Sequence, residues 1–271
     1  MKADCGTQPC YNLFMKKKYS KITFLALAFL AVGLIACFLY KGFLPGKALT
    51  LENHNISENN DFFRVRAEYP QFSRASRDFN DKIKELVTGK IAEFKKSSNE
   101  YWQARRETAS PGETVPTAPE VPFDFIAHWE HDRFDEKYIS VVLKIYYFSG
   151  GAHGNEEIHT FNYDLKNRRE IGIMDFIGSE ENLRAISNLA KTQLAASLES
   201  MGWRSTSDTW SMLDEGAAPT LENYKDFTFN QDVLTVYFQK YQVAAGAAGS
   251  QQAFFYKDNL EAEGINLNWP K

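Results

Sequence analysis

The chain has 271 residues, a formal net charge of -4 and 24% charged residues, a size that allows one large domain or two modest ones. Hydrophobic residues make up 44%, which excludes a disordered, collagen-like or multi-span membrane protein. The acidic balance, with no Lys/Arg-rich block outside the N-terminal region, gives no reason to expect nucleic acid as a partner.

An uncharged apolar run, residues 22–40, follows a basic cluster near the N-terminus. About 20 apolar residues are enough to span a bilayer as a helix. Because Lys16, Lys17, Lys18 and Lys21 precede the run, the positive-inside rule keeps residues 1–21 in the cytoplasm. The sequence therefore predicts a membrane anchor at residues 22–40, with the rest of the chain outside the cytoplasm.

A secretory signal is the second interpretation of this segment. Met15 and the lysines after it are typical of the start of such a signal, and Leu34–Cys37 resembles the bacterial lipobox, which makes Cys37 a lipidation candidate. The apolar run continues beyond Cys37 to Tyr40, whereas a lipoprotein usually turns polar there. We therefore favour the uncleaved anchor over the lipoprotein signal. Whether the protein starts at Met1 or at Met15 stays open.

Charge and cysteine are distributed unevenly along the chain. Residues 1–47 hold seven lysines and one acidic residue, which leaves 24 basic and 34 acidic residues beyond, a net charge of about -10. All three cysteines, at positions 5, 10 and 37, lie in the same N-terminal part. The exported part must therefore be held by its core and not by disulfides.

The sequence predicts an α+β fold with antiparallel sheets packed against two main helices, in two successive small subdomains. The parts are a polar tether at 41–60, a strand–helix subdomain at 61–122 that ends in a Pro-rich loop, and a C-terminal domain at 123–271. Helices are expected at 74–96 and after Ser179, where apolar residues recur at three- and four-residue spacing. In the first helix, Lys90 and Glu93 are expected on the solvent side. Strands are expected at 62–69, 123–130, 138–148, 158–165, 227–229, 234–238 and 253–256, with 203–224 irregular.

Catalytic motifs are absent from the sequence. There is no phosphate-binding loop, no dinucleotide fingerprint, no HExxH and no GxSxG. His128 and His131 have a spacing found in metal sites, but residues three apart in a strand point to opposite faces. We therefore expect no catalytic residue, no metal and no cofactor.

The most distinctive motif follows an aromatic strand. Tyr146-Tyr147-Phe148 ends abruptly in Ser149-Gly150-Gly151-Ala152-His153-Gly154, so the backbone must turn sharply or approach another group closely. The loop either presents free N–H groups to an anion or glycan, with His153 as a polar contact, or simply joins two strands. The second alternative is the commoner one.

The same motif, with later segments, resembles a known extracytoplasmic module. It is the module of the lysozyme-sensing anti-sigma factor RsiV and of the N-terminal region of the peptidoglycan deacetylase PdaC. The residues that carry the resemblance are Gly150–Gly154, Tyr163-Asp164, Asp175–Ile177, Tyr241–Ala244 and Gly249. It covers about residues 63–256, and residues 63–96 resemble the companion domain that precedes the module. The chain departs from the pattern at Ala245-Gly246, where the family more often has a proline and an aromatic residue.

The resemblance implies a non-enzymatic, membrane-anchored, sensor-like module of the bacterial cell envelope. Its expected partner is peptidoglycan or a basic wall-degrading protein such as lysozyme. Only 21 residues precede the apolar run, too few for a cytoplasmic sigma-binding domain, and no segment after Tyr256 could form a deacetylase domain. The ligand-binding candidates are Ser149, Gly150, Gly151, Ala152, His153, Gly154, Tyr241 and Gly249.

Two alternatives stay open. One is an enzyme acting on envelope glycans, which would use His153 with a carboxylate such as Asp164 or Glu156. The other is a purely structural envelope lipoprotein. A catalytic site needs side chains that converge in a cleft, whereas a binding module needs an exposed aromatic or acidic surface. The position of His153 relative to a pocket is therefore the observation that distinguishes them.

Overall fold

The computed structural model describes residues 48–110, 114, 118–119, 121–150, 153–203 and 207–270. Residues 49–271 form one compact unit. The anchor expected at 22–40 and the lipidation candidate Cys37 lie outside the described residues. Within the described part of the chain, no helix combines the length and the apolar character that a membrane span requires.

The described residues form two sheets, one of six strands in the order β1-β2-β3-β4-β5-β6 and one of three in the order β7-β8-β9. The larger sheet consists of β1 (Leu51–Asn59), β2 (Phe63–Phe72), β3 (Phe123–Phe134), β4 (Tyr138–Phe148), β5 (Asn155–Asp164) and β6 (Arg169–Glu170). The smaller sheet consists of β7 (Phe227–Phe229), β8 (Val233–Phe238) and β9 (Gln251–Tyr256). The helices are α2 (Arg77–Glu107), α3 (Ile173–Ile177), α4 (Glu180–Ser200), α5 (Ser207–Gly216) and α6 (Lys257–Ala262), with 3-10 turns at Glu222–Tyr224 and Gly246–Ala248. The mixed α+β class expected from the sequence is confirmed.

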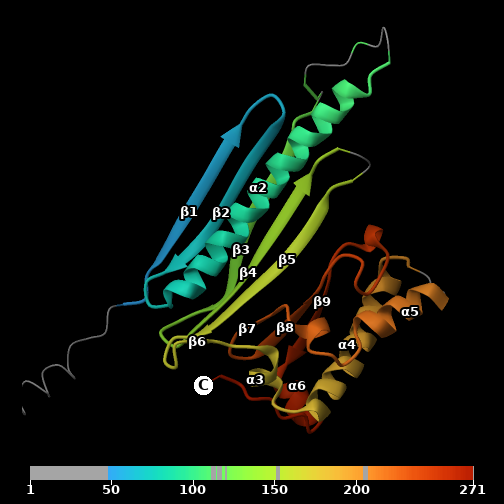
Figure 1. The fold of residues 1–271 in the computed structure, drawn as a ribbon. Helices are drawn as coiled ribbons and strands as arrows, with labels where there is room; N and C mark the ends of the chain where they lie inside the picture. The colour runs from blue at the N-terminus through green and yellow to red at the C-terminus, as the bar shows by residue number, and fades with distance from the viewer. Residues whose placement is uncertain are drawn as a thin grey trace, which may run out of the picture. The chain divides into compact units, whose positions relative to one another are not determined.

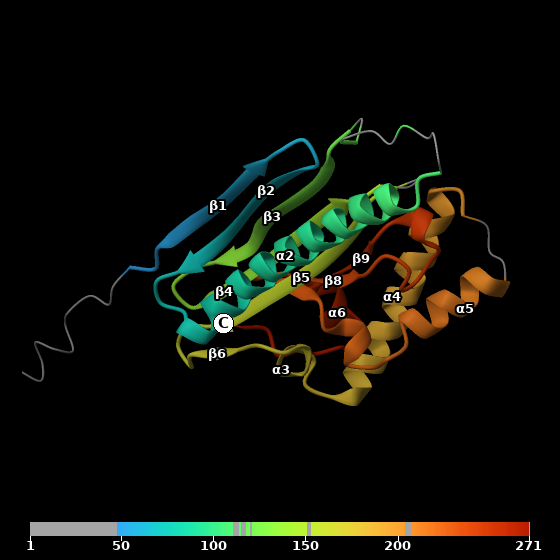
Figure 2. The same cartoon turned by 45° about the horizontal axis from the view of Figure 1, so that its top comes forward.

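The elements stack in four layers. Helix α2 lies along one face of the larger sheet, and the smaller sheet lies against the other face, with α4 beyond it (Figures 1 and 2). One core joins α2 to the larger sheet, and a second core joins the smaller sheet to α3 and α4. Between the sheets, Val142 and Ile158 pack against Tyr237.

Helix α2 forms over the apolar stripe from which it was predicted. Ser76 caps its start, accepting a hydrogen bond from the Phe79 backbone nitrogen at 3.2 Å. The buried side of the helix continues beyond the expected end through Ser98 to Trp102, so the helix ends at Glu107 and not near Lys96. Ser179 caps α4 in the same way and confirms the second expected helix.

Strand β4 is the central element and matches its expected bounds. Side chains on one face, from Ile139 to Ile145, enter the core under α2, while Val142 on the other face packs toward the smaller sheet. Both faces are covered, which explains why the segment is almost continuously apolar.

The expected tether is wrong from residue 51 onward. Residues 51–59 form β1, which pairs antiparallel with β2 from Leu51 opposite Phe72 to Asn59 opposite Arg64. Its polar composition concealed the strand, because an edge strand is held by backbone hydrogen bonds and needs few buried side chains.

Two further expectations on topology require correction. The larger sheet is mixed and not antiparallel, because β2 and β3 run parallel, with α2 providing the crossover between them. The boundary expected at residue 122 therefore falls between two paired strands of one sheet. The two cores divide instead between Leu165 and Ile171.

Asn162 links the two sheets, and Asn162→Ala should lower the free energy of unfolding by about 2 kcal/mol. Its side chain, 5% exposed, accepts from the Ser140 hydroxyl at 2.6 Å and donates to the Phe227 carbonyl at 2.7 Å. Alanine leaves both partners buried without these bonds. Urea unfolding measures the loss, with the exposed Asn188→Ala as control. Equal stability of the two variants would contradict this role.

Candidate functional site

Two connections far apart in sequence meet at one end of the sheets. One joins β4 to β5, and the other joins β8 to β9. The Lys240 ammonium donates to the Gly154 carbonyl at 3.1 Å and lies 3.4 Å from His153 Nδ1. Next to it, the Gln239 side chain accepts from the Ile158 backbone nitrogen at 3.0 Å. The structure thus brings His153 and Gly154 together with the segment that carries Tyr241.

Tyr241 is held in an unusual backbone conformation. Its φ is 70°, in the left-handed region that side-chain-bearing residues rarely adopt, and its side chain is 55% exposed. The ring packs on Gly246 so closely that a Cβ there would lie 2.1 Å from it. The Lys240 ammonium also contacts the Tyr241 ring, at 5.4 Å from the ring centroid, as a cation–π pair. Gly246, where the chain departs from the family pattern, therefore makes room for the tyrosine.

Tyr146 on β4 repeats the arrangement. Its side chain is 41% exposed, and a Cβ at Gly154 would lie 2.4 Å from its ring. Each tyrosine is thus seated on a glycine, and Lys240 connects the two pairs. We name Tyr146, Gly154, Lys240, Tyr241 and Gly246 the tyrosine–glycine surface. Sequence reasoning selected Tyr241 and Gly154 but missed the other three, although Lys240 directly precedes Tyr241 and Tyr146 begins the recognised motif.

His153 contacts this surface through Lys240, whereas the remaining candidates in the described part of the chain lie elsewhere. Gly150 has φ 91°, and a Cβ there would lie 3.4 Å from the ring of Phe123. Ser149 lines a pocket beneath α2. Gly249, with φ 71°, occupies a turn, and the next residue, Ser250, donates to the Glu156 carboxylate at 2.7 Å. Gly151 and Ala152 lie outside the described residues.

Asp164 and Glu156, the carboxylates considered for a glycan-modifying enzyme, lie in different parts of the structure, and each is hydrogen-bonded to other residues. Asp164 lies at the far end of β5 from His153, about 30 Å away by the rise of a strand, and accepts from the backbone nitrogens of Lys166 and Asn167 at 2.9 Å. Glu156 is bound by Ser250. Within the described residues, no group of three or more His, Cys, Asp or Glu side chains is arranged to hold a metal ion.

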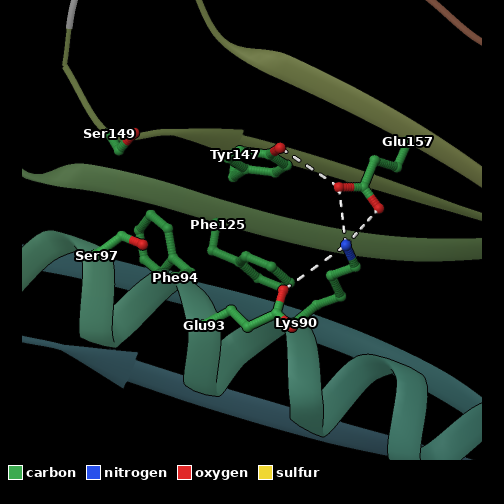
Figure 3. Close-up of a pocket in the computed structure, with 8 residues that line it drawn as sticks. All are labelled: Lys90, Glu93, Phe94, Ser97, Phe125, Tyr147, Ser149 and Glu157. Atoms are coloured by element: carbon green, nitrogen blue, oxygen red, sulfur yellow. Dashed lines mark hydrogen bonds and ion pairs between the residues drawn. The ribbon is translucent and has the colours of Figure 1, made fainter.

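A second cluster, which sequence reasoning missed, lies under α2. Lys90 was expected on the solvent side of the helix, but its ammonium forms an ion pair with Glu157 on β5 at 2.9 Å, and its side chain is only 27% exposed. His159 and the Tyr147 hydroxyl approach the same carboxylate at 3.1 and 3.4 Å. Figure 3 shows Lys90, Glu157 and Tyr147 of this network, which line a pocket of about 150 Å³.

The network sets the protonation of its members. Hydrogen bonds from His159 and then Lys90 outweigh the effect of burial and lower the pKa of Glu157 to about 2. Burial, together with the Glu157 charge, raises the pKa of Tyr147. Burial lowers the pKa of Lys90, but the hydrogen bond and charge of Glu157 outweigh it, so the net change is upward. Glu157 and Lys90 are therefore a charged pair at neutral pH.

Two family models match successive parts of the chain. A family model described as deacetylase PdaC matches residues 56–156, and one described as a protein of unknown function, DUF3298, matches residues 175–256. The chain therefore carries a PdaC-like segment followed by a DUF3298-like segment, and the resemblance stated from the sequence is confirmed. Tyr146 and Gly154 come from the first match, whereas Lys240, Tyr241 and Gly246 come from the second.

One curated relative and two solved structures are similar to the chain. The peptidoglycan-N-acetylmuramic acid deacetylase PdaC of Bacillus subtilis (strain 168) is 27% identical over 200 residues, which are 73% of this chain and 38% of that protein. The chain thus spans well under half the length of that relative. A crystal structure of a DUF3298 family member from Bacteroides fragilis shares the fold, with a TM-score of 0.53, 16% identity and coverage of 79% of this chain and 92% of that one. A DUF3298 family protein from Pseudomonas aeruginosa PAO1 gives a TM-score of 0.46 at 14% identity, over 78% of this chain and 93% of that one.

Proposed function

We propose that the chain is a non-enzymatic, membrane-anchored binding module of the bacterial cell envelope. Its partner is a basic wall-degrading protein such as lysozyme, with peptidoglycan as the other candidate, and it binds at the tyrosine–glycine surface. The observation that carries the proposal is Tyr241, an exposed aromatic side chain fixed in a strained backbone conformation. Such strain is retained where the exposed group has a use.

The geometry of the surface suits recognition. Tyrosine contributes a large contact area with little loss of conformational entropy and is enriched among the residues that dominate binding energy. Tyr146 and Tyr241 are already immobilised against Gly154 and Gly246, so little ordering cost accompanies association. The net charge of about -10 beyond residue 47 adds attraction for a basic partner.

The location is supported by two independent features. The B. subtilis relative is named for an activity on peptidoglycan, which lies outside the cytoplasm. The sequence also provides the apolar run at 22–40 with lysines on its N-terminal side, the arrangement that sends the following chain across a membrane.

A binding role is favoured over catalysis by the placement of the polar side chains. His153, the only histidine at the tyrosine–glycine surface among the described residues, contacts Lys240 and the Gly154 carbonyl and no carboxylate. Asp164 lies at the other end of β5, and Glu156 is hydrogen-bonded to Ser250. No acid–base pair therefore converges on a substrate position here.

Calorimetric titration of the detergent-solubilised chain with lysozyme tests the proposal. We expect binding that weakens but persists at 0.3 M salt, because buried aromatic contacts survive screening of the charges. Tyr241→Ala should weaken it by about 30-fold and His153→Ala by less. Gly246→Ala should act like Tyr241→Ala, because the new methyl group occupies the space of the ring while keeping the tyrosine.

Tyr256→Ala is the matched control, since Tyr256 is 53% exposed on β9 and contributes nothing to the tyrosine–glycine surface. Binding that is equally weakened by the control variant would contradict the assigned surface. An absence of heat with lysozyme at every salt level would remove this partner, and sedimentation with purified peptidoglycan would then test the other candidate.

A further inference from the structure

The pocket under α2 has the composition of a ligand site. It is lined by successive turns of the helix and by β3, β4, β5 and the start of the loop after β4 (Figure 3). Its apolar wall consists of Phe94 and Phe125, whose ring centroids are 5.5 Å apart, together with the ring of Tyr147. Two hydroxyls, Ser97 and Ser149, line it as well.

The charges at the pocket limit what it accepts. Lys90 stands between two carboxylates, at 2.9 Å from Glu157 and 3.7 Å from Glu93. The three groups sum to one negative charge, and Lys90, the only cation among the described residues that line the pocket, is already paired. An anionic ligand would therefore be repelled, whereas a neutral one would not.

The hydrogen-bonding capacity points to a hydroxylated ligand. The side chains of Ser97 and Ser149 make no hydrogen bond with any other described residue. A cavity of about 150 Å³ accommodates one six-membered ring. Phenylalanine rings together with hydroxyl groups match a ring with an apolar face and polar edges.

We propose that this pocket is a binding subsite for one neutral, hydroxylated sugar ring of the N-acetylhexosamine type. The acetamido methyl group packs on Phe94 and Phe125, and the ring hydroxyls bond to Ser97 and Ser149. The choice of sugar rests on the proposed envelope function, whereas the pocket is independent of the tyrosine–glycine surface.

Saturation-transfer difference NMR on the full chain tests the proposal. The chain is held in a detergent without a sugar headgroup, and the probes are N-acetylglucosamine and glucuronate. We expect saturation transfer to N-acetylglucosamine, strongest at the acetyl methyl group, with a dissociation constant of about 1 mM, and none to glucuronate. Ser149→Ala should weaken binding about fivefold, because one neutral hydrogen bond is lost.

Ser97→Leu is the decisive variant, because a leucine at this rim position fills the pocket and should abolish the signal. Asn99→Leu adds the same side chain two residues along, at an exposed position on another side of α2, and should leave binding unchanged. Equal signals from the two sugars, or a signal that survives Ser97→Leu, would overturn the subsite. Tyr241→Ala separates the two proposals, since it should leave N-acetylglucosamine binding intact while weakening lysozyme binding.

Discussion

Gly216→Ala should lower the free energy of unfolding by about 3 kcal/mol or more. Gly216 is buried at the end of α5, and a Cβ there would lie 1.9 Å from the carbonyl oxygen of Gln242. The obstacle is backbone, so a rotamer change cannot relieve it. The same residue pair is tied by a hydrogen bond of 2.8 Å from Gln242 Nε2 to the Gly216 carbonyl. Displacement of the backbone at 242 therefore also disturbs Tyr241.

Gly89→Ala is the matched control for this experiment. Gly89 lies inside α2, and a Cβ there would meet nothing within 4 Å. Alanine is favoured over glycine in a helix interior, so this variant should gain about 0.5–1 kcal/mol. Urea unfolding followed by tryptophan fluorescence measures both changes. Two variants with the same sign and size of effect would show that close packing does not select glycine at position 216.

Elements that depend on local signals were predicted well. The bounds of β4 follow from its own apolar and aromatic residues. The start of α4 follows from the N-cap Ser179 and the acidic residues in the first turn of the helix. The hairpin of β7 and β8 was found because turn residues separate two aromatic segments. Each of these elements carries the information for its structure within a few residues.

Features that depend on distant partners were not predicted. Strand β1 is polar and is a strand only because β2 pairs with it, and the parallel pairing of β2 with β3 depends on where α2 returns the chain. The two candidate sites were missed for the same reason, because each is formed by residues far apart in sequence. Lys90 looks like an exposed lysine until Glu157, 67 residues later, lies opposite it. Gly246 looks like a flexible loop residue until the Tyr241 ring is placed on it.

Acid should remove the contribution of the Lys90–Glu157 ion pair to the free energy of unfolding. The pKa of Glu157 is lowered from 4.5 to about 2 in the folded chain, by its bonds to His159 and Lys90. The unfolded chain therefore binds a proton at Glu157 before the folded chain does as the pH falls. The stabilisation is present above pH 4.5 and is lost progressively between pH 4.5 and about 2. Its upper limit is about 3 kcal/mol, because each pKa unit corresponds to about 1.4 kcal/mol.

Glu157→Gln should remove this contribution, because glutamine keeps the size of the side chain but carries no charge to pair with Lys90. We expect the variant to be less stable than the wild type at pH 7, by an amount that shrinks as the pH approaches 2. The exposed Glu263→Gln controls for the general effect of losing one carboxylate. Urea unfolding at a series of pH values measures the three curves. A Glu157→Gln curve parallel to that of the wild type from pH 5 to pH 2 would show that the carboxylate is not held by its partners. A curve that converges on the wild type would instead assign the acid sensitivity of this region to one ion pair, which lines the pocket proposed to hold a sugar.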